Sequence, residues 1–195
     1  MDDDALTFLL ATAEQLGATK ARIISPDLVS VEDTLADFCL HPQCPFWGQS
    51  LSCPPYVGGP EEFRRFLKEC RYVLVVRLEI QACSLLGEER PEVMRLLHEL
   101  VAALEIKARQ NGFSNAAGFA GGSCKPCFCA DQPDCRAVTT IKKCRYPNQA
   151  RPSLSGYGVN VGKLMESAGW SGDLFTQEND EQEQFSWIAG LILLS

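Results

Sequence analysis

Four stretches of the chain carry apolar residues at the spacing of an amphipathic helix. In the longest, Met94, Leu97 and Val101 follow one another at steps of three and four residues, and Asn111-Gly112 ends the pattern. The same spacing predicts helices over residues 4–16, from Pro60 to about residue 70, over 91–110 and over 158–168.

Strand patterns alternate with these helices. Residues 71–80 form a nearly continuous apolar run, which is typical of a central strand, whereas residues 21–31 contain Pro26, which favours an edge strand or two short pieces around a bend. Strands are also expected over 113–120 and, as a closing strand, over 185–194. We therefore predict one domain over residues 1–195, with an α/β or α+β fold in which a single sheet is flanked by helices.

Two segments show neither the helical period of about 3.6 residues nor the strand period of about two. We name them the first cysteine segment (residues 38–60) and the second cysteine segment (residues 121–157). Both are rich in proline and cysteine, and the second is longer than an unsupported loop normally runs. They are expected as loop insertions that some further group organises. The acidic stretch 173–183 is expected to be a solvated loop.

Composition limits the classes of function. The 195 residues include 46% hydrophobic residues, enough for a core, and the formal net charge of −7 argues against a nucleic-acid partner. The acidic start Asp2-Asp3-Asp4 is unlike a signal peptide, and no apolar run is long enough to span a bilayer, so we expect a cytoplasmic protein without a membrane partner. Because thiols stay reduced there, the ten cysteines suggest metal or redox chemistry rather than disulfides.

The first cysteine segment holds the spacing Cys39-x4-Cys44-x8-Cys53. No Asp, Glu, Lys or Arg lies between residues 38 and 56, so these thiols suit a soft metal in neutral, partly apolar surroundings. A tetrahedral zinc site needs four ligands. The fourth could come from His41, Cys70 or Cys83, or the position could stay open; as non-ligands, Cys70 and Cys83 are expected to be ordinary buried thiols.

The second cysteine segment holds five cysteines, namely Cys124, Cys127, Cys129, Cys135 and Cys144. The Cys-x-x-Cys pair at its start lets the backbone turn and aim both sulfurs at one metal or one cluster edge. Residues 124–151 also contain six Lys and Arg against two Asp, in a chain that is otherwise strongly acidic. Such local positive charge would stabilise an anionic thiolate cluster.

The choice of metal follows from spacing. Zinc modules usually pair two similar knuckles, but this chain has one Cys-x-x-Cys, and its other spacings are irregular and interleaved with proline, as in Cys53-Pro54-Pro55. We therefore favour an iron–sulfur cluster, preferably of the 4Fe–4S type, with zinc as the alternative metal and thiol redox chemistry as a third option.

Several motifs together resemble those of a microbial, cysteine-rich family described as predicted metal-binding proteins, a domain of unknown function. They are Cys44-Pro45-Phe46-Trp47-Gly48, Ser52-Cys53-Pro54-Pro55, Gly122-Ser123-Cys124, Cys144-Arg145-Tyr146-Pro147, Ala150-Arg151-Pro152-Ser153 and Gly158-Val159-Asn160-Val161. The resemblance covers nearly the whole chain. It implies Cys39, Cys44 and Cys53 as ligands of one site, and Cys124, Cys127 and Cys144 as ligands of a second.

The chain departs from the family pattern in two places. Leu154-Ser155 stands where the family usually has Met-Glu, and the stretch after Cys127 is longer, so Cys129 and Cys135 compete as the fourth ligand of the second site. Cys135 is the preferred choice, because thiolates at 127 and 129 are too close in sequence to converge readily on one cluster.

Three other polar side chains are candidates for specific roles. Arg145 and Arg151 are candidates for binding an anionic cofactor or substrate, against the simpler expectation that they pair with carboxylates or loop carbonyls. His98 lies close to the apolar stripe of its helix and is expected to be partly buried and hydrogen-bonded. A P-loop, a nucleophile elbow and a dinucleotide fingerprint are all missing from the sequence.

These observations lead to three hypotheses. The first is a metal-binding, iron–sulfur protein with one or two clusters, acting in electron transfer or as a redox accessory, with a redox protein as its partner. The alternative is a zinc-stabilised binding module. The third is an enzyme in which a cluster held by three cysteines acts as a Lewis acid on a small substrate.

Overall fold

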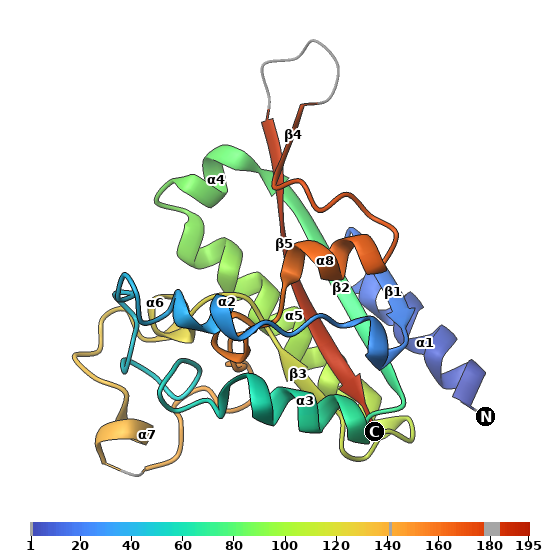
Figure 1. Cartoon of the computed structure of the whole chain (residues 1–195), viewed down its shortest axis with the longest axis horizontal. Coiled ribbons are helices and arrows are strands. Elements are labelled where there is room, and N and C mark those ends of the chain that lie inside the picture. Colours follow the sequence, from blue (N-terminus) through green and yellow to red (C-terminus); the bar gives the residue numbers. More distant parts are fainter. Residues whose placement is uncertain (1, 141, 178–183) are drawn as a thin grey trace.

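A computed structural model describes residues 2–140, 142–177 and 184–195, and its centre is an antiparallel sheet (Figure 1). The strands are β1 (Lys20–Ile24), β2 (Tyr72–Gln81), β3 (Ala117–Phe119), β4 (Phe175–Gln177) and β5 (Gln184–Leu194). Four of them are ordered β1-β2-β5-β3, and the short β4 pairs with the other end of β5. Because every pair of these strands is antiparallel, the α+β form of the predicted fold is confirmed.

Helices surround the sheet. The longer ones are α1 (Asp2–Gln15), α3 (Gly59–Glu69), α5 (Arg90–Gln110) and α8 (Val161–Ser167). The shorter elements are η1 (Pro26–Leu28), α2 (Asp33–Asp37), α4 (Ala82–Leu86), α6 (Cys124–Phe128), α7 (Arg136–Thr139) and η2 (Ser155–Tyr157). Figure 1 shows α2, α6 and α7 together on the left of the molecule, away from α1.

The two faces of the sheet bury two separate cores, as the two-residue period of its strands dictates. Leu74 and Ile192 belong to the core that packs against α1 and α5. Val73 and Leu191, one position earlier in each strand, belong to the core that packs against α3 and α8. The strands β2 and β5 are therefore buried on both faces, which explains their continuous apolar runs.

Two glycines let α5 approach the sheet closely. A Cβ atom at Gly190 would lie 2.6 Å from Val101 Cγ2, and one at Gly118 would lie 2.7 Å from Val101 Cγ1 and 2.9 Å from Glu105 Oε2. Only glycine leaves room for the helix at these positions.

The long elements agree with the sequence predictions, and the shorter ones differ. The expected edge strand over 21–31 ends at Ile24, where Pro26 begins η1; the expected strand over 113–120 shortens to Ala117–Phe119. The last strand, expected to close the sheet, lies in its middle, between β2 and β3. Part of the acidic stretch forms β4 instead of a loop, and residues 178–183 lie outside the described residues.

Candidate metal-binding site

Buried serines join the two cysteine segments. Ser50 Oγ lies 2.9 Å from Ser52 Oγ and 3.3 Å from Ser123 Oγ, and the Cys124 N–H donates to Ser52 Oγ at 3.1 Å. Ser52 also accepts the N–H of Ser153 on its carbonyl, at 2.9 Å. Segments that are more than 70 residues apart in the sequence are therefore held against each other by these hydrogen bonds.

Four of the five cysteines of the second segment line one small hollow. These are Cys124, Cys129, Cys135 and Cys144. The hollow has a volume of about 20 Å³ and is also lined by three basic side chains, Lys125, Arg136 and Arg145. Neutral and cationic groups therefore surround the four thiols, which is the environment that an anionic thiolate centre requires.

Cys127 is placed differently from the other four. It does not line this hollow; its buried thiol donates to the Ser123 carbonyl at 3.3 Å. The reason lies in α6, in which Cys127 is still helical and packs into the core beside α5, whereas Cys129 caps the end of the helix with φ −137° and ψ 31°, outside the helical conformation. The structure thus groups Cys129, rather than Cys127, with Cys135.

Backbone contacts hold the Cys144 end of the hollow. Arg136 donates to the carbonyls of Lys143 at 2.7 Å and Cys144 at 3.1 Å, and Arg145 donates to the Asp134 carbonyl at 3.3 Å. The N–H of Tyr146 donates to Cys144 Sγ at 3.3 Å. Hydrogen bonds to cysteine sulfurs are among the features that tune a metal–thiolate centre.

Burial is the main influence on the thiols at the joint between the segments. It raises the pKa of Cys124, which neighbouring Ser52 and Ser50 lower and the Cys144 and Cys53 thiols raise further. Burial also raises the pKa of Cys127 to about 12 and that of Cys129, where the nearby Arg145 acts in the opposite direction. These thiols are protonated at neutral pH, so a metal would have to displace their protons.

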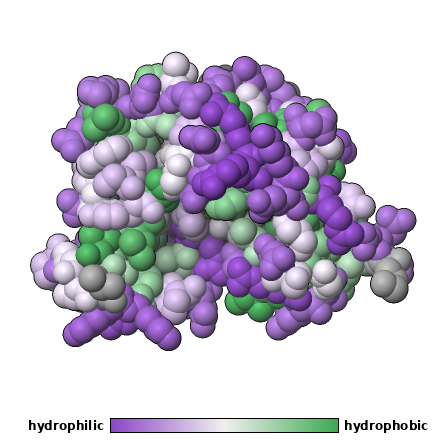
Figure 2. All heavy atoms as spheres, turned by 60° about the horizontal axis from the view of Figure 1, so that its bottom comes forward, coloured by the Kyte–Doolittle hydropathy of each residue, from purple (hydrophilic) through white to green (hydrophobic). Residues whose placement is uncertain are grey.

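The three cysteines of the first segment line one cavity of about 400 Å³. Cys39, Cys44 and Cys53 share its wall with Phe46 and Trp47, and burial, followed by the other two thiols, raises the pKa of Cys39. Figure 2 shows a face on which hydrophobic atoms gather on the left, the side where Figure 1 places α2, α6 and α7, next to a hollow. The first site is thus larger and more open than the second.

None of the three candidates for a fourth ligand lines this cavity. Cys70 is buried as predicted, in the core under α3, where burial raises the pKa of its thiol to about 11. Cys83 is exposed, which corrects the prediction that it is buried: β2 ends at Gln81 and α4 then turns it to the surface. His41 is also exposed. Within residues 2–140, 142–177 and 184–195, no three His, Cys, Asp or Glu side chains are close enough to hold one metal ion.

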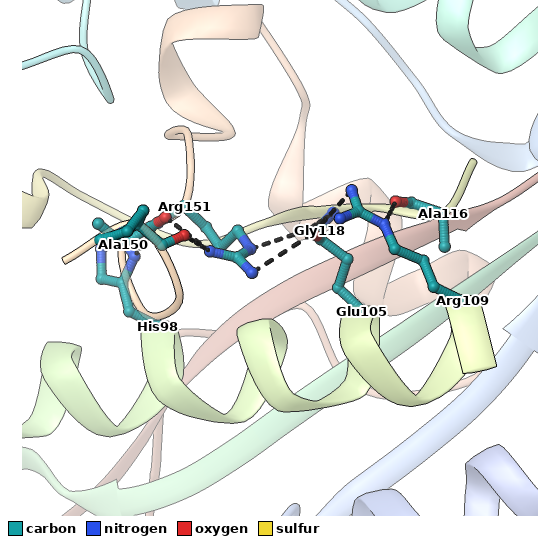
Figure 3. Close-up of polar contacts among 8 residues, drawn as sticks. His98, Glu105, Arg109, Ala116, Gly118, Ala150 and Arg151 are labelled. Carbon is teal, nitrogen blue, oxygen red and sulfur yellow. Dashed lines mark hydrogen bonds and ion pairs between the residues drawn. The ribbon is translucent and has the colours of Figure 1, made fainter. Parts of the chain in front are cut away.

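A buried polar network supports the second segment from the core side (Figure 3). Arg151 is 7% exposed; its Nε donates to Glu105 Oε2 at 2.7 Å, and its Nη1 donates to the carbonyls of Pro147 and Ala150. Glu105 also accepts from the Gly118 N–H at 2.7 Å and pairs with Arg109 at 2.9 Å. The expected pairing of Arg145 and Arg151 with carboxylates or carbonyls is confirmed, and their binding of an anion stays a prediction.

His98 belongs to the same network. It is completely buried, its Nδ1 accepts the Arg151 N–H at 3.1 Å, and its Nε2 is without a partner among the described residues. Burial, reinforced by the charge of Arg151, lowers the pKa of His98 to about 4. Glu105, the partner that holds Arg151, was missed in the sequence, although it stands on the apolar face of its helix, where a lone carboxylate needs a partner.

Comparison with known proteins gives one family. The family model described as "Predicted metal-binding protein (DUF2284)" matches residues 22–193. No curated protein and no solved structure matches the chain. None of the helices in the described part of the chain is long and apolar enough to cross a membrane.

Proposed function

Because the chain belongs to the DUF2284 family of predicted metal-binding proteins, we propose that it is an iron–sulfur protein with two sites, acting in electron transfer or as a redox accessory. The observation that carries the proposal is that four cysteines line one hollow among basic side chains. This proposal places the protein in the cytoplasm, where thiols stay reduced.

The proposed ligands of the second site are Cys124, Cys129, Cys135 and Cys144. They differ from the family-based expectation in one member, since Cys129 replaces Cys127. Support comes from their common hollow, from the N–H···S bond to Cys144 and from the cations Lys125, Arg136 and Arg145. Four thiolates complete the ligand set of a 4Fe–4S cluster, and nearby positive charge stabilises its anionic form and raises its potential.

The proposed ligands of the first site are Cys39, Cys44 and Cys53, with one position open toward the cavity. The two sites are neighbours, because Ser52 Oγ accepts from Cys124 N–H and lies 3.7 Å from Cys53 Sγ. A cluster bound at each site would supply one-electron chemistry. The hydrogen-bonded serines between the two sites would hold two such clusters at a fixed distance from each other.

Zinc is the alternative metal, and it would make the protein a stabilised binding module. The type of donor alone does not separate the two metals, since cysteine thiolates bind both zinc and iron–sulfur clusters. Irregular spacing and the single Cys-x-x-Cys favour iron–sulfur.

The test is anaerobic reconstitution of the full-length protein with iron and sulfide, followed by metal and acid-labile sulfide analysis and electron paramagnetic resonance of the reduced form. We expect iron and sulfide in equal amounts and two distinguishable paramagnetic centres. A colourless protein that retains stoichiometric zinc and takes up no iron would refute the proposal.

A second function, enzymatic catalysis, is favoured by one specific observation: the three-cysteine set faces a cavity large enough for an organic ligand. A three-cysteine cluster with an open position would act there as a Lewis acid. Binding of a small ligand that shifts the resonance of one centre and leaves the other unchanged would support it; an identical spectrum with and without ligand would refute it.

A further inference from the structure

We propose that the cavity beside the three-cysteine set binds a small carboxylate with an apolar, preferably aromatic, body, and that Arg90 pairs with its carboxyl group. The inference deepens the proposed function by naming the ligand class of the first site. It rests on that function for the role of the ligand, whereas the binding itself depends only on the cavity.

The size and lining of the cavity indicate how large the ligand is and that its body is apolar. Its volume of about 400 Å³ lies within the usual range of small-molecule sites. Aromatic and aliphatic side chains dominate the lining, among them Phe46, Trp47, Pro54 and Met94. Flat aromatic and soft sulfur-containing side chains pack well against an aromatic ring.

The charge at the cavity determines which polar group the ligand should carry. Among the residues that the structure describes, Arg90, at the start of α5, is the one charged side chain that lines the cavity, and none of the lining residues is acidic. Arg90 is exposed, and within the described part of the chain it makes no ion pair; its guanidinium reaches only the Leu85 carbonyl, at a long 3.4 Å. A solvent-exposed guanidinium beside an apolar chamber is suited to an anion that enters with its apolar end first.

Hydroxyl groups supply the remaining polarity. Ser123, Ser153 and Ser155 line the same cavity, and Ser155 is exposed. They give the ligand hydrogen-bond partners without adding charge. A neutral ligand would leave Arg90 without a counter-charge, and a cation would be repelled by it.

The test is isothermal titration calorimetry of the full-length protein with 2-naphthoate and with the neutral analogue 2-naphthamide. We expect saturable binding of both, with 2-naphthoate tighter by about three- to fivefold, the value of an exposed ion pair. Arg90→Gln should bind both equally, and its retained binding of 2-naphthamide shows that it is folded. Arg95→Gln is the matched control, because Arg95 is exposed on the same helix and does not line the cavity.

A blocking variant gives a second criterion. Ser155→Phe should remove binding of both compounds, because the new ring would fill the cavity from its exposed side. The inference is overturned if wild type gives no saturable heat, if the amide binds as tightly as the carboxylate, or if Ser155→Phe binds like wild type. Iron is measured on the same samples, so that the two proposals can be told apart. Ligand binding without iron would support the ligand proposal and refute the proposed function. Iron without ligand binding would support the proposed function and refute the ligand proposal.

Discussion

The Glu105–Arg151 pair is the internal anchor of the second cysteine segment, and replacing Glu105 with Ala tests that role. The pair is buried, at 5% and 7% exposure, and Glu105 also accepts the Gly118 N–H (Figure 3). The variant leaves Arg151 as an uncompensated buried charge, which typically costs about 3–5 kcal/mol, and leaves the Gly118 N–H unpaired. We expect a loss of about 4 kcal/mol in the free energy of unfolding.

Urea unfolding followed by circular dichroism measures this loss as a shift of the midpoint. Glu99→Ala is the matched control on the same helix, because its pair with Arg95 is largely exposed and should contribute less than about 0.5 kcal/mol. Glu105→Gln keeps an acceptor oxygen and should lie between the two. If Glu105→Ala loses no more stability than Glu99→Ala, the buried pair does not anchor the segment.

Three further predictions test other parts of the account. Cys129→Ser should lose the iron of the second site after reconstitution, whereas Cys127→Ser should retain it; iron analysis with the opposite pattern would refute the ligand assignment. The pKa of His98 is about 4 in the folded protein and ordinarily 6.5, so the unfolded state binds more protons between these values and stability is lost as the pH falls from 6.5 towards 4. Between about pH 7.5 and about pH 5.5 this loss is about 1.4 kcal/mol, and urea unfolding of His98→Asn, which keeps an acceptor for the Arg151 N–H, should lack this part of the pH dependence; an equal loss in the variant would contradict it. Gly190→Ala should destabilise the protein by about 1–3 kcal/mol in thermal or urea unfolding, because its Cβ would lie 2.6 Å from Val101 Cγ2. Gly162→Ala, whose Cβ would meet the Asn160 side chain at an ordinary 3.5 Å, should be neutral or slightly stabilising. Equal effects of the two substitutions would show that α5 can move away from the sheet at little cost.

Strong periodicity explains what the sequence revealed of the fold. The pattern of α5 and the apolar run of β2 are long and unambiguous, so both elements lie where they were predicted. The central place of β5 could not be predicted, because the pairing of strands depends on contacts far apart in the sequence. The short helices α6 and α7 lie in proline- and cysteine-rich segments that have too few residues for a period.

For the candidate site, too, the sequence predicted one part and the structure was needed for the rest. Cysteine spacing was enough to predict two sets of thiols, and the family description agrees with metal binding. Spacing does not tell which side of a short helix faces the core, so the different placement of Cys127 and Cys129 needed coordinates. The cavity beside Trp47 also depends on α5, which is distant in sequence, and only the folded chain brings Arg90 to it.

Anomalous scattering from crystals of the reconstituted protein, recorded at the iron and zinc edges, tests the central claim most directly. The account predicts iron density at two places, one among Cys124, Cys129, Cys135 and Cys144 and the other beside Cys39, Cys44 and Cys53. Zinc density at these places, or iron bound through Cys127 instead of Cys129, would contradict it.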